Sequence, residues 1–338
     1  MDVGKSSSVR SLYLRTLGFE SRQGIEHDVT NRLANAIREK RGDSLPVRLS
    51  GTLEDFLIDS QPRWNDAIPH GRLEFDESTK RFVVYLGAQW RTGATTGLEE
   101  EGCGRLRFTY AHEVAHRFFF VERNGCWKRA LDIVADSVSP SEAFRARRVL
   151  SDLEESLCNS IAARVLIPGD KLAELCATRA GFTSDTQGLF CTGVTTVARL
   201  FAVTRKCFLV RLRKAIDKEE IHLGGSFCAL LCGISNEKGP SRSHRRMRVT
   251  VPIVPSRLGG YQLPRKFNGI SVRTFGEPLH DLCAKALTGG PANGRVEVPL
   301  RLRRVVENKQ ESDFNAWMTG NWRRLKSGEV LVWGRLRL

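Results

Sequence analysis

Long apolar runs are missing from this sequence. No stretch of its 338 residues approaches the ~20 consecutive apolar residues that a membrane-spanning helix needs. The first residues, Met-Asp-Val-Gly-Lys-Ser-Ser-Ser, lack the apolar centre of a secretory signal peptide. We therefore expect a cytoplasmic protein that has no membrane partner.

The cysteine pattern excludes a disulfide scaffold. The nine cysteines are scattered and odd in number, which favours reduced thiols in a cytoplasm. Cys228 and Cys232 form a C-x-x-x-C pair, a poor match to a zinc ribbon. Because both lie in an apolar run, we interpret them as buried core thiols.

Acidic residues are too few to balance the basic ones, and the net charge is +15. Residues 218–338 contain 21 Lys and Arg against 10 Asp and Glu, whereas residues 1–217 contain 32 against 28. A basic C-terminal third suits an acidic partner, either nucleic acid or an acidic protein surface. A well-solvated surface without a partner explains the excess equally well.

Residues 108–119 contain the motif H-E-x-x-H, formed by His112, Glu113 and His116. Residues four apart lie on one face of a helix, so both imidazoles can point at a single ion. Glu113 lies beside them, where it can act on a water molecule. The alternative is a chance match on a core helix with two hydrogen-bonded histidines.

A third ligand is needed, because catalytic zinc usually has three protein ligands and one open position. The spacing of Leu153, Leu157, Ile161 and Val165 predicts a helix within residues 151–168. Ser151 and Glu154 fit a capping box at its start. Glu155 is the candidate ligand, but a solvated carboxylate in the first helical turn explains it equally well.

Two motifs resemble those of the ImmA/IrrE metallopeptidases. Residues 107–116, RFTYAHEVAH, are similar to R-F-x-x-A-H-E-x-x-H. Residues 155–168, ESLCNSIAARVLIP, are similar to E-x-x-A-N-x-F-A-x-x-L-L-M-P, with Cys158 where alanine is usual and Ile161 where phenylalanine is usual. The gap between the motifs is longer than in the family. The resemblance covers about residues 70–215.

The resemblance implies a zincin-like core, with a small antiparallel sheet beside the motif helix and a helical subdomain. It implies Zn²⁺ held by His112, His116 and Glu155, with Glu113 as the general base. It also implies limited cleavage of a regulatory protein such as a transcriptional repressor. Arg107, Tyr110 and Arg117 are near in sequence as candidate donors to the developing oxyanion.

The N-terminal part gives weaker patterns. Residues 1–24 are polar without a clear period, and we expect little fixed structure there. Residues 28–40 predict a helix, and residues 46–59 a short strand followed by a short helix. Residues 72–86 predict a hairpin with its turn near residues 76–79.

The region around the motif helix contains two expected irregular segments. Residues 91–104 are Gly-rich and polar, which predicts a loop, and residues 124–139 are candidates for a flap beside the cleft. Ser139 begins a second capping-box signal, with proline at the next position. It competes with Ser151, and we favour two helices that break near Ser151 over one long helix.

Residues 194–215 predict a helix, a turn at residues 202–204, and a basic second helix. A DNA-reading helix-turn-helix has this shape. Phe208, Leu209 and Leu212 are apolar, which commits part of the second helix to a core, so we favour a packing role.

The remaining chain predicts a basic, β-rich domain. Residues 246–254 and 328–338 read as strands, residues 277–287 as a helix, and alternating apolar residues within 296–302 as a further strand. We interpret three tryptophans there as core residues. They are Trp317, Trp322 and Trp333.

We therefore expect an α+β chain of three parts. They are an N-terminal segment, residues 1–68; a zincin-like core, residues 69–217; and a basic C-terminal domain, residues 218–338. The expected function is that of a cytoplasmic zinc endopeptidase. The alternatives are a DNA-binding regulator, or a toxin–antitoxin or phage-defence component, in which the zinc is structural.

Overall fold

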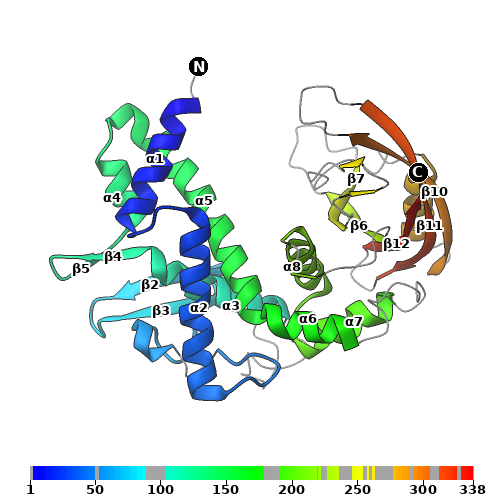
Figure 1. Cartoon of the computed structure of the whole chain (residues 1–338). Coiled ribbons are helices and arrows are strands. Elements are labelled where there is room, and N and C mark those ends of the chain that lie inside the picture. Colours follow the sequence, from blue (N-terminus) through cyan, green and yellow to red (C-terminus); the bar gives the residue numbers. More distant parts are fainter. Residues whose placement is uncertain are drawn as a thin grey trace. The chain divides into compact units, whose positions relative to one another are not determined.

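A computed structural model describes most of the chain, which folds as α+β (Figure 1). The described residues are 3–49, 53–88, 104–178, 190–218, 220–221, 227–235, 246–253, 257–258, 261–262, 277–288, 292–304, 312–325 and 329–337. They form two compact units. The first comprises Met1–Pro168 and Arg199–Thr204, and the second comprises Gly169–Ala198 and Arg205–Leu338.

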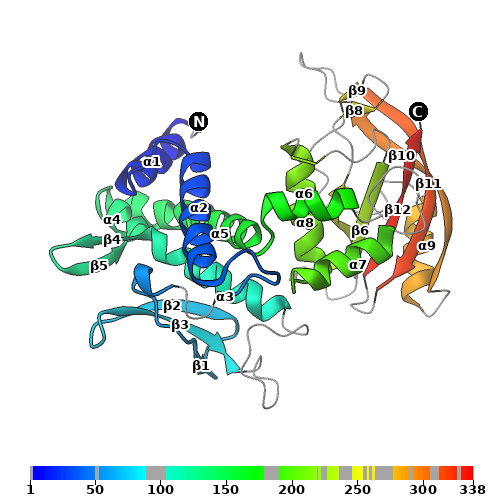
Figure 2. The same ribbon diagram turned by 60° about the horizontal axis from the view of Figure 1, so that its bottom comes forward.

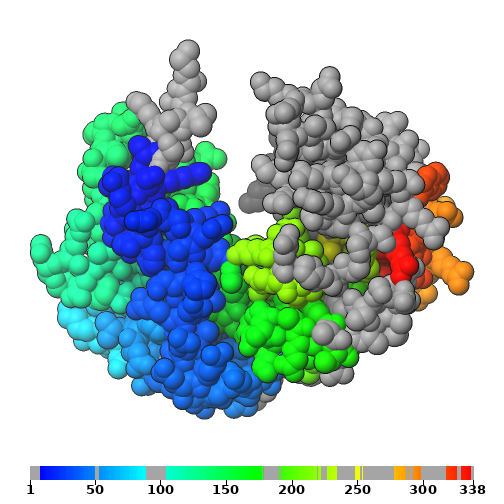
Figure 3. All heavy atoms as spheres, in the orientation of Figure 1, coloured from blue at the N-terminus to red at the C-terminus, as the bar shows by residue number. Residues whose placement is uncertain are grey.

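The first unit begins with two helices, α1 (Val3–Thr16) and α2 (Arg22–Arg41), which form a continuous part of its visible surface (Figure 3). The expectation of a loose N-terminus was wrong, because Tyr13 and Leu14 anchor α1 in the core. The helix expected at residues 28–40 is confirmed as part of α2. It starts earlier because the Ser21 hydroxyl caps it, accepting from the Gly24 N–H at 3.0 Å.

A three-stranded sheet follows, in the order β1-β3-β2. Its strands are β1 (Arg63–Asn65), β2 (Gly71–Asp76) and β3 (Arg81–Gly87). The predicted hairpin is confirmed, and Asp76 closes its turn by accepting from the Ser78 N–H at 3.0 Å. The sheet is mixed, since β1 runs parallel to β3. Within residues 46–59, the described part contains the 3₁₀ turn η1 (Glu54–Phe56) and a single bridge from Ile58, but no strand.

Helix α3 (Gly104–His116) carries the motif and packs on β2 and on α5 (Pro140–Leu166). Except for Gly104, the expected loop at 91–104 lies outside the described residues. Helix α5 is continuous, so the expected break near Ser151 was wrong. Proline suits the first position of a helix, and Ser139 precedes it as the N-cap, so the first of the two start signals is the one used.

Along the chain, residues 120–136 connect α3 to α5 and form a hairpin followed by a short helix. The hairpin consists of β4 (Phe120–Arg123) and β5 (Cys126–Arg129), and α4 (Ala130–Asp136) follows. Asn124 and Gly125 have φ of 52° and 75°, as a two-residue turn requires. The expected flap is therefore regular structure, with Ala130 and Val134 buried.

In the part of the second unit that the structure describes, three helices precede the sheet (Figure 2). They are α6 (Gly169–Thr178), α7 (Phe190–Leu200) and α8 (Arg205–Asp217). The predicted helix, turn and helix are confirmed at α7 and α8, with a positive φ of 49° at Ala202. Phe208, Leu209 and Leu212 are buried, so α8 is committed to a core. We expected these helices with the motif core, whereas α8 contacts the second unit's sheet.

That sheet is antiparallel, in the order β10-β11-β12-β6-β7. Its strands are β6 (Phe227–Ser235), β7 (Arg246–Ile253), β10 (Asn293–Arg304), β11 (Ser312–Arg324) and β12 (Val330–Arg337). Helix α9 (Glu277–Leu287) contacts it, and β8 (Arg257–Leu258) pairs with β9 (Tyr261–Gln262). The predicted helix and the strands at β7, β10 and β12 are confirmed, whereas β6 and β11 were not anticipated.

The buried side chains of this sheet include most of the expected ones. Cys228, Cys232, Trp322 and Trp333 are buried, as predicted. Trp317 is 48% exposed, so its assignment to the core was wrong. No helix among the described residues is long and apolar enough to cross a membrane.

Candidate metal centre

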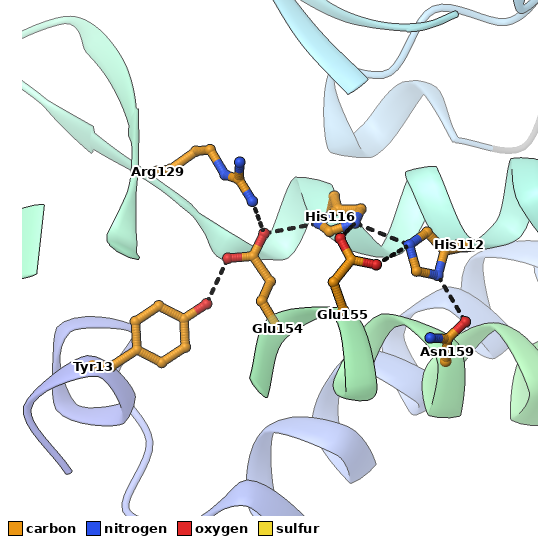
Figure 4. A network of polar contacts seen from close by, with 7 residues as sticks. All are labelled: Tyr13, His112, His116, Arg129, Glu154, Glu155 and Asn159. Atoms are coloured by element: carbon orange, nitrogen blue, oxygen red, sulfur yellow. Dashed lines mark hydrogen bonds and ion pairs between the residues drawn. The ribbon is translucent and has the colours of Figure 1, made fainter. Parts of the chain in front are cut away.

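Helices α3 and α5 bring the two sequence motifs together (Figure 4). His112 and His116 lie one turn apart on α3. Glu155 and Asn159 lie one turn apart on α5 and are exposed. The equal spacing on two packed helices sets the two pairs opposite each other.

The three candidate ligands converge. The Nε2 atoms of His112 and His116 lie 3.1 Å apart. Glu155 places one carboxylate oxygen 3.1 Å from His112 Nε2 and the other 3.4 Å from His116 Nε2. Among the described residues, these three side chains form the group that could hold a metal ion.

The outer contacts of each histidine fix which ring nitrogen faces the other candidate ligands. His112 Nδ1 lies 3.2 Å from Asn159 Oδ1, and His116 Nδ1 lies 2.8 Å from a carboxylate oxygen of Glu154. Both oxygens accept, so both Nδ1 atoms donate, and each Nε2 would offer its lone pair to a metal ion that displaces its proton. Two such nitrogens and a carboxylate facing one point match the donor set of a divalent metal.

The electrostatics also favour positive charge at this point. Burial alone would lower the pKa of His116, but hydrogen bonds with Cys158, Glu154 and Glu155 outweigh it and raise the pKa to about 12. Hydrogen bonds from His112 and His116 hold the pKa of Glu155 well below its usual range. The site therefore keeps its carboxylate ionised and attracts a cation.

Glu154 is fully buried, which the sequence analysis missed. Burial alone would raise its pKa, but hydrogen bonds and charges from His116 and Arg129 outweigh burial and lower it. A signal was present: Leu150, Glu154, Leu157 and Ile161 recur at the spacing of a buried helix face. A charged residue within such a stripe is a candidate for a paired internal role.

Glu113 lines the same cavity as the three candidate ligands but is not one of them. It is 8% exposed, and no hydrogen bond to its carboxylate occurs within the described part of the chain. Burial raises its pKa, while the charges of His116 and His112 oppose this rise. An ionisable group with a raised pKa and an open carboxylate suits proton transfer.

A cavity of about 720 Å³ opens in front of these residues. Strand β2, which lies at an edge of its sheet, forms one wall, and Phe108, Phe120 and Trp127 add aromatic side chains. The lining residues are His70, Gly71, Arg72, Leu73, Glu74, Phe75, Glu77, Phe108, Thr109, His112, Glu113, His116, Phe120, Trp127, Arg129, Glu155 and Asn159.

The three candidate oxyanion donors do not line this cavity. Arg107 is buried and donates to the Val47 carbonyl at 2.6 Å. Arg117 donates to a backbone carbonyl and stacks on the Trp127 ring, and Tyr110 is buried. Nearness in sequence therefore does not identify the oxyanion donor.

Cys158 does not join the candidate ligands, although it lies one turn from Glu155. Its side chain is fully buried, and burial raises the pKa of its thiol to about 12. The described residues therefore leave Glu155 as the third member of the group.

Comparison with models of protein families found no match, and comparison with curated proteins found none. Among solved structures, a Mycobacterium tuberculosis transcriptional regulator is similar, with a TM-score of 0.40 and 12% sequence identity. The similarity covers 94% of this chain and 79% of that chain. A likeness of this degree leaves the function to be argued from the site itself.

Proposed function

We propose that the protein is a zinc-dependent endopeptidase with a zincin-like core. The main support is the separation of roles at the site. His112, His116 and Glu155 form a group that could hold a metal ion, while Glu113 faces the same cavity without a hydrogen-bond partner among the described residues. A structural metal site has no need of that fourth, buried carboxylate.

Zinc held by His112, His116 and Glu155 would activate water and polarise the scissile carbonyl. Glu113 accepts the proton of the attacking water, for which its raised pKa suits it. It then passes the proton to the leaving amine nitrogen. The three ligands would be occupied by the metal ion, which leaves Glu113 as the group that carries the proton.

The substrate is an extended segment of a protein. Strand β2 is an edge strand of its sheet and lines the cavity, so its free backbone groups can pair with an extended chain. Leu73, Phe75 and Trp127 offer apolar contacts in the same cavity. The resemblance to the ImmA/IrrE metallopeptidases supports a regulatory protein, such as a transcriptional repressor in the cytoplasm, as the substrate.

A second candidate function is DNA or partner binding with a structural metal, as in a regulator or a toxin–antitoxin or phage-defence component. The helix, turn and helix at α7 and α8 and the basic composition of residues 218–338 favour it. The buried Phe208, Leu209 and Leu212 count against base reading by α8, because these side chains are committed to packing.

The test is to compare protein cleavage in the native cell with wild type and with Glu113→Gln, by sequencing newly formed protein N-termini. Glu39→Gln serves as the matched control, since Glu39 is an exposed residue of α2. New N-termini present with wild type and Glu39→Gln but absent with Glu113→Gln are the expected result. Identical N-termini in all three strains would contradict peptidase activity.

A further inference from the structure

We propose that Glu154 is a positioning residue that ties the metal centre to the N-terminal helix α1 through Tyr13. This inference rests on the metal site of the proposed function. Neither Glu154 nor Tyr13 is among the residues that could hold the ion. Their effect on the site is exerted through His116.

The Glu154 carboxylate is fully buried and accepts hydrogen bonds from three different elements (Figure 4). One oxygen accepts from His116 Nδ1 at 2.8 Å and from Arg129 Nη2 at 2.7 Å. The other accepts from the Tyr13 hydroxyl at 2.8 Å. An ionised carboxylate without solvent needs such partners, so each donor helps to hold the oxygen that orients His116.

Tyr13 reaches His116 by an apolar route as well. Its ring stacks on Phe119, with the centroids 6.4 Å apart and the planes within 4°. The Phe119 ring in turn meets the His116 imidazole edge-on, with the centroids also 6.4 Å apart. Tyr13 is fully buried and contacts both Glu154 and Phe119, each of which contacts the His116 ring.

Arg129 connects the same carboxylate oxygen to the substrate cavity. It lines the cavity, and its side chain is 37% exposed. Its positive charge balances the negative charge of the fully buried Glu154 carboxylate. The oxygen that selects the His116 tautomer is thus shared between a metal ligand and the cavity wall.

The physical consequence concerns metal affinity. With its Nδ1–H held, His116 presents a fixed Nε2 lone pair, whereas a released imidazole can rotate and change tautomer. Loss of an outer contact of this kind typically weakens metal binding by about 10–100-fold. Changing Tyr13 on α1 should weaken metal binding too, although α1 contains none of the candidate ligands.

The experiment measures Zn²⁺ affinity of the full chain by chelator competition, and the visible absorption spectrum of its Co²⁺ form. Tyr13→Phe removes the hydroxyl donor, and Tyr110→Phe is the matched control, because the buried Tyr110 hydroxyl has no partner among the described residues. Tyr13→Phe should weaken Zn²⁺ binding several-fold and shift the Co²⁺ bands. Tyr110→Phe should do neither.

Glu154→Gln provides the second comparison, since glutamine keeps the shape and removes the charge. It should weaken Zn²⁺ binding by about 10–100-fold. Glu26→Gln is its control, because Glu26 is a largely buried carboxylate that bonds Ser160 on α5. If Glu154→Gln does not fold, Tyr13→Phe alone decides the proposal.

Wild-type affinity and an unchanged spectrum in folded Tyr13→Phe would overturn the link to α1, as would equal losses in Tyr13→Phe and Tyr110→Phe. Because neither readout requires cleavage, the outcome is separate from that of the peptidase proposal. A chain that binds Zn²⁺ as expected but cleaves nothing would refute only the proposed function.

Discussion

Gly71, the first residue of β2, lies directly against Glu113. A Cβ atom built on Gly71 would stand 2.7 Å from both Cγ and Oε1 of Glu113, and 2.8 Å from Thr109 Cγ2. These separations are shorter than real Cβ contacts, so only glycine fits here without movement. The absence of a side chain at Gly71 therefore leaves the space that the Glu113 side chain occupies.

Gly71→Ala should displace Glu113 while leaving the three candidate metal ligands in place. A misplacement of about 1 Å at a reacting group can cost about 10²-fold in rate. We expect the cleavage rate to fall toward that extent with metal content unchanged. Gly24→Ala, on α2, should leave both the rate and the metal content at wild-type values. Full activity in Gly71→Ala would show that Glu113 tolerates displacement.

Glu155→Ala should weaken metal binding about as strongly as His112→Ala, because each removes one of three ligands. Cys158→Ala should bind metal more tightly than Glu155→Ala does, since Cys158 is not in the converging group of ligands. A metal titration of these variants ranks their metal affinities, with Asp152→Ala as an exposed acidic residue of the same helix for comparison. Greater loss in Cys158→Ala than in Glu155→Ala would move the third ligand by one turn.

The continuity of α5 can be tested at Ser151. Proline inside a helix removes a hydrogen bond and clashes with the preceding turn, which costs about 3 kcal/mol or more. Ser151→Pro should lower the free energy of unfolding by that amount, whereas Ser151→Ala should change it little. Chemical denaturation measures both. Equal stabilities would be evidence for the two shorter helices that the sequence favoured.

The second unit offers a surface on which to test nucleic-acid binding. Trp317, Thr319 and Arg323 alternate along β11, and Trp317, Arg295 and Arg323 are exposed. If this face binds single strands, the affinity of the full chain should fall linearly with salt on logarithmic axes, and Trp317→Ala should weaken it. Thr178→Ala on α6 is an exposed control. Absence of binding at low salt would favour a protein partner.

Local spacing was enough to predict the main pieces of the site. His112 and His116 are one helical turn apart, and Glu155 and Asn159 repeat that spacing, so a pairing of two helices brings all four together. The hairpin of β2 and β3 was visible because its turn residues separate two apolar runs.

Other parts depend on contacts between distant residues. Tyr13 and Glu154 are 141 positions apart, and no periodicity in either segment indicates their hydrogen bond. The sequence of α1 did not predict an ordered helix, because most of its residues are polar and few of them, such as Tyr13 and Leu14, are buried. Ser151 and Glu154 match the sequence pattern of a helix start. Helix α5 nevertheless begins after Ser139 and continues through Ser151, because its buried face packs along the whole helix.

The central claim is that His112, His116 and Glu155 hold a catalytic zinc ion while Glu113 is the base and not a ligand. The most direct measurement compares zinc content and substrate cleavage in purified wild type, Glu113→Gln and His112→Ala. We predict that Glu113→Gln keeps its zinc and its fold but loses about 10²–10⁴-fold in rate. His112→Ala should lose both zinc and activity. Full activity of Glu113→Gln, beside an inactive His112→Ala, would contradict the account and make the metal structural.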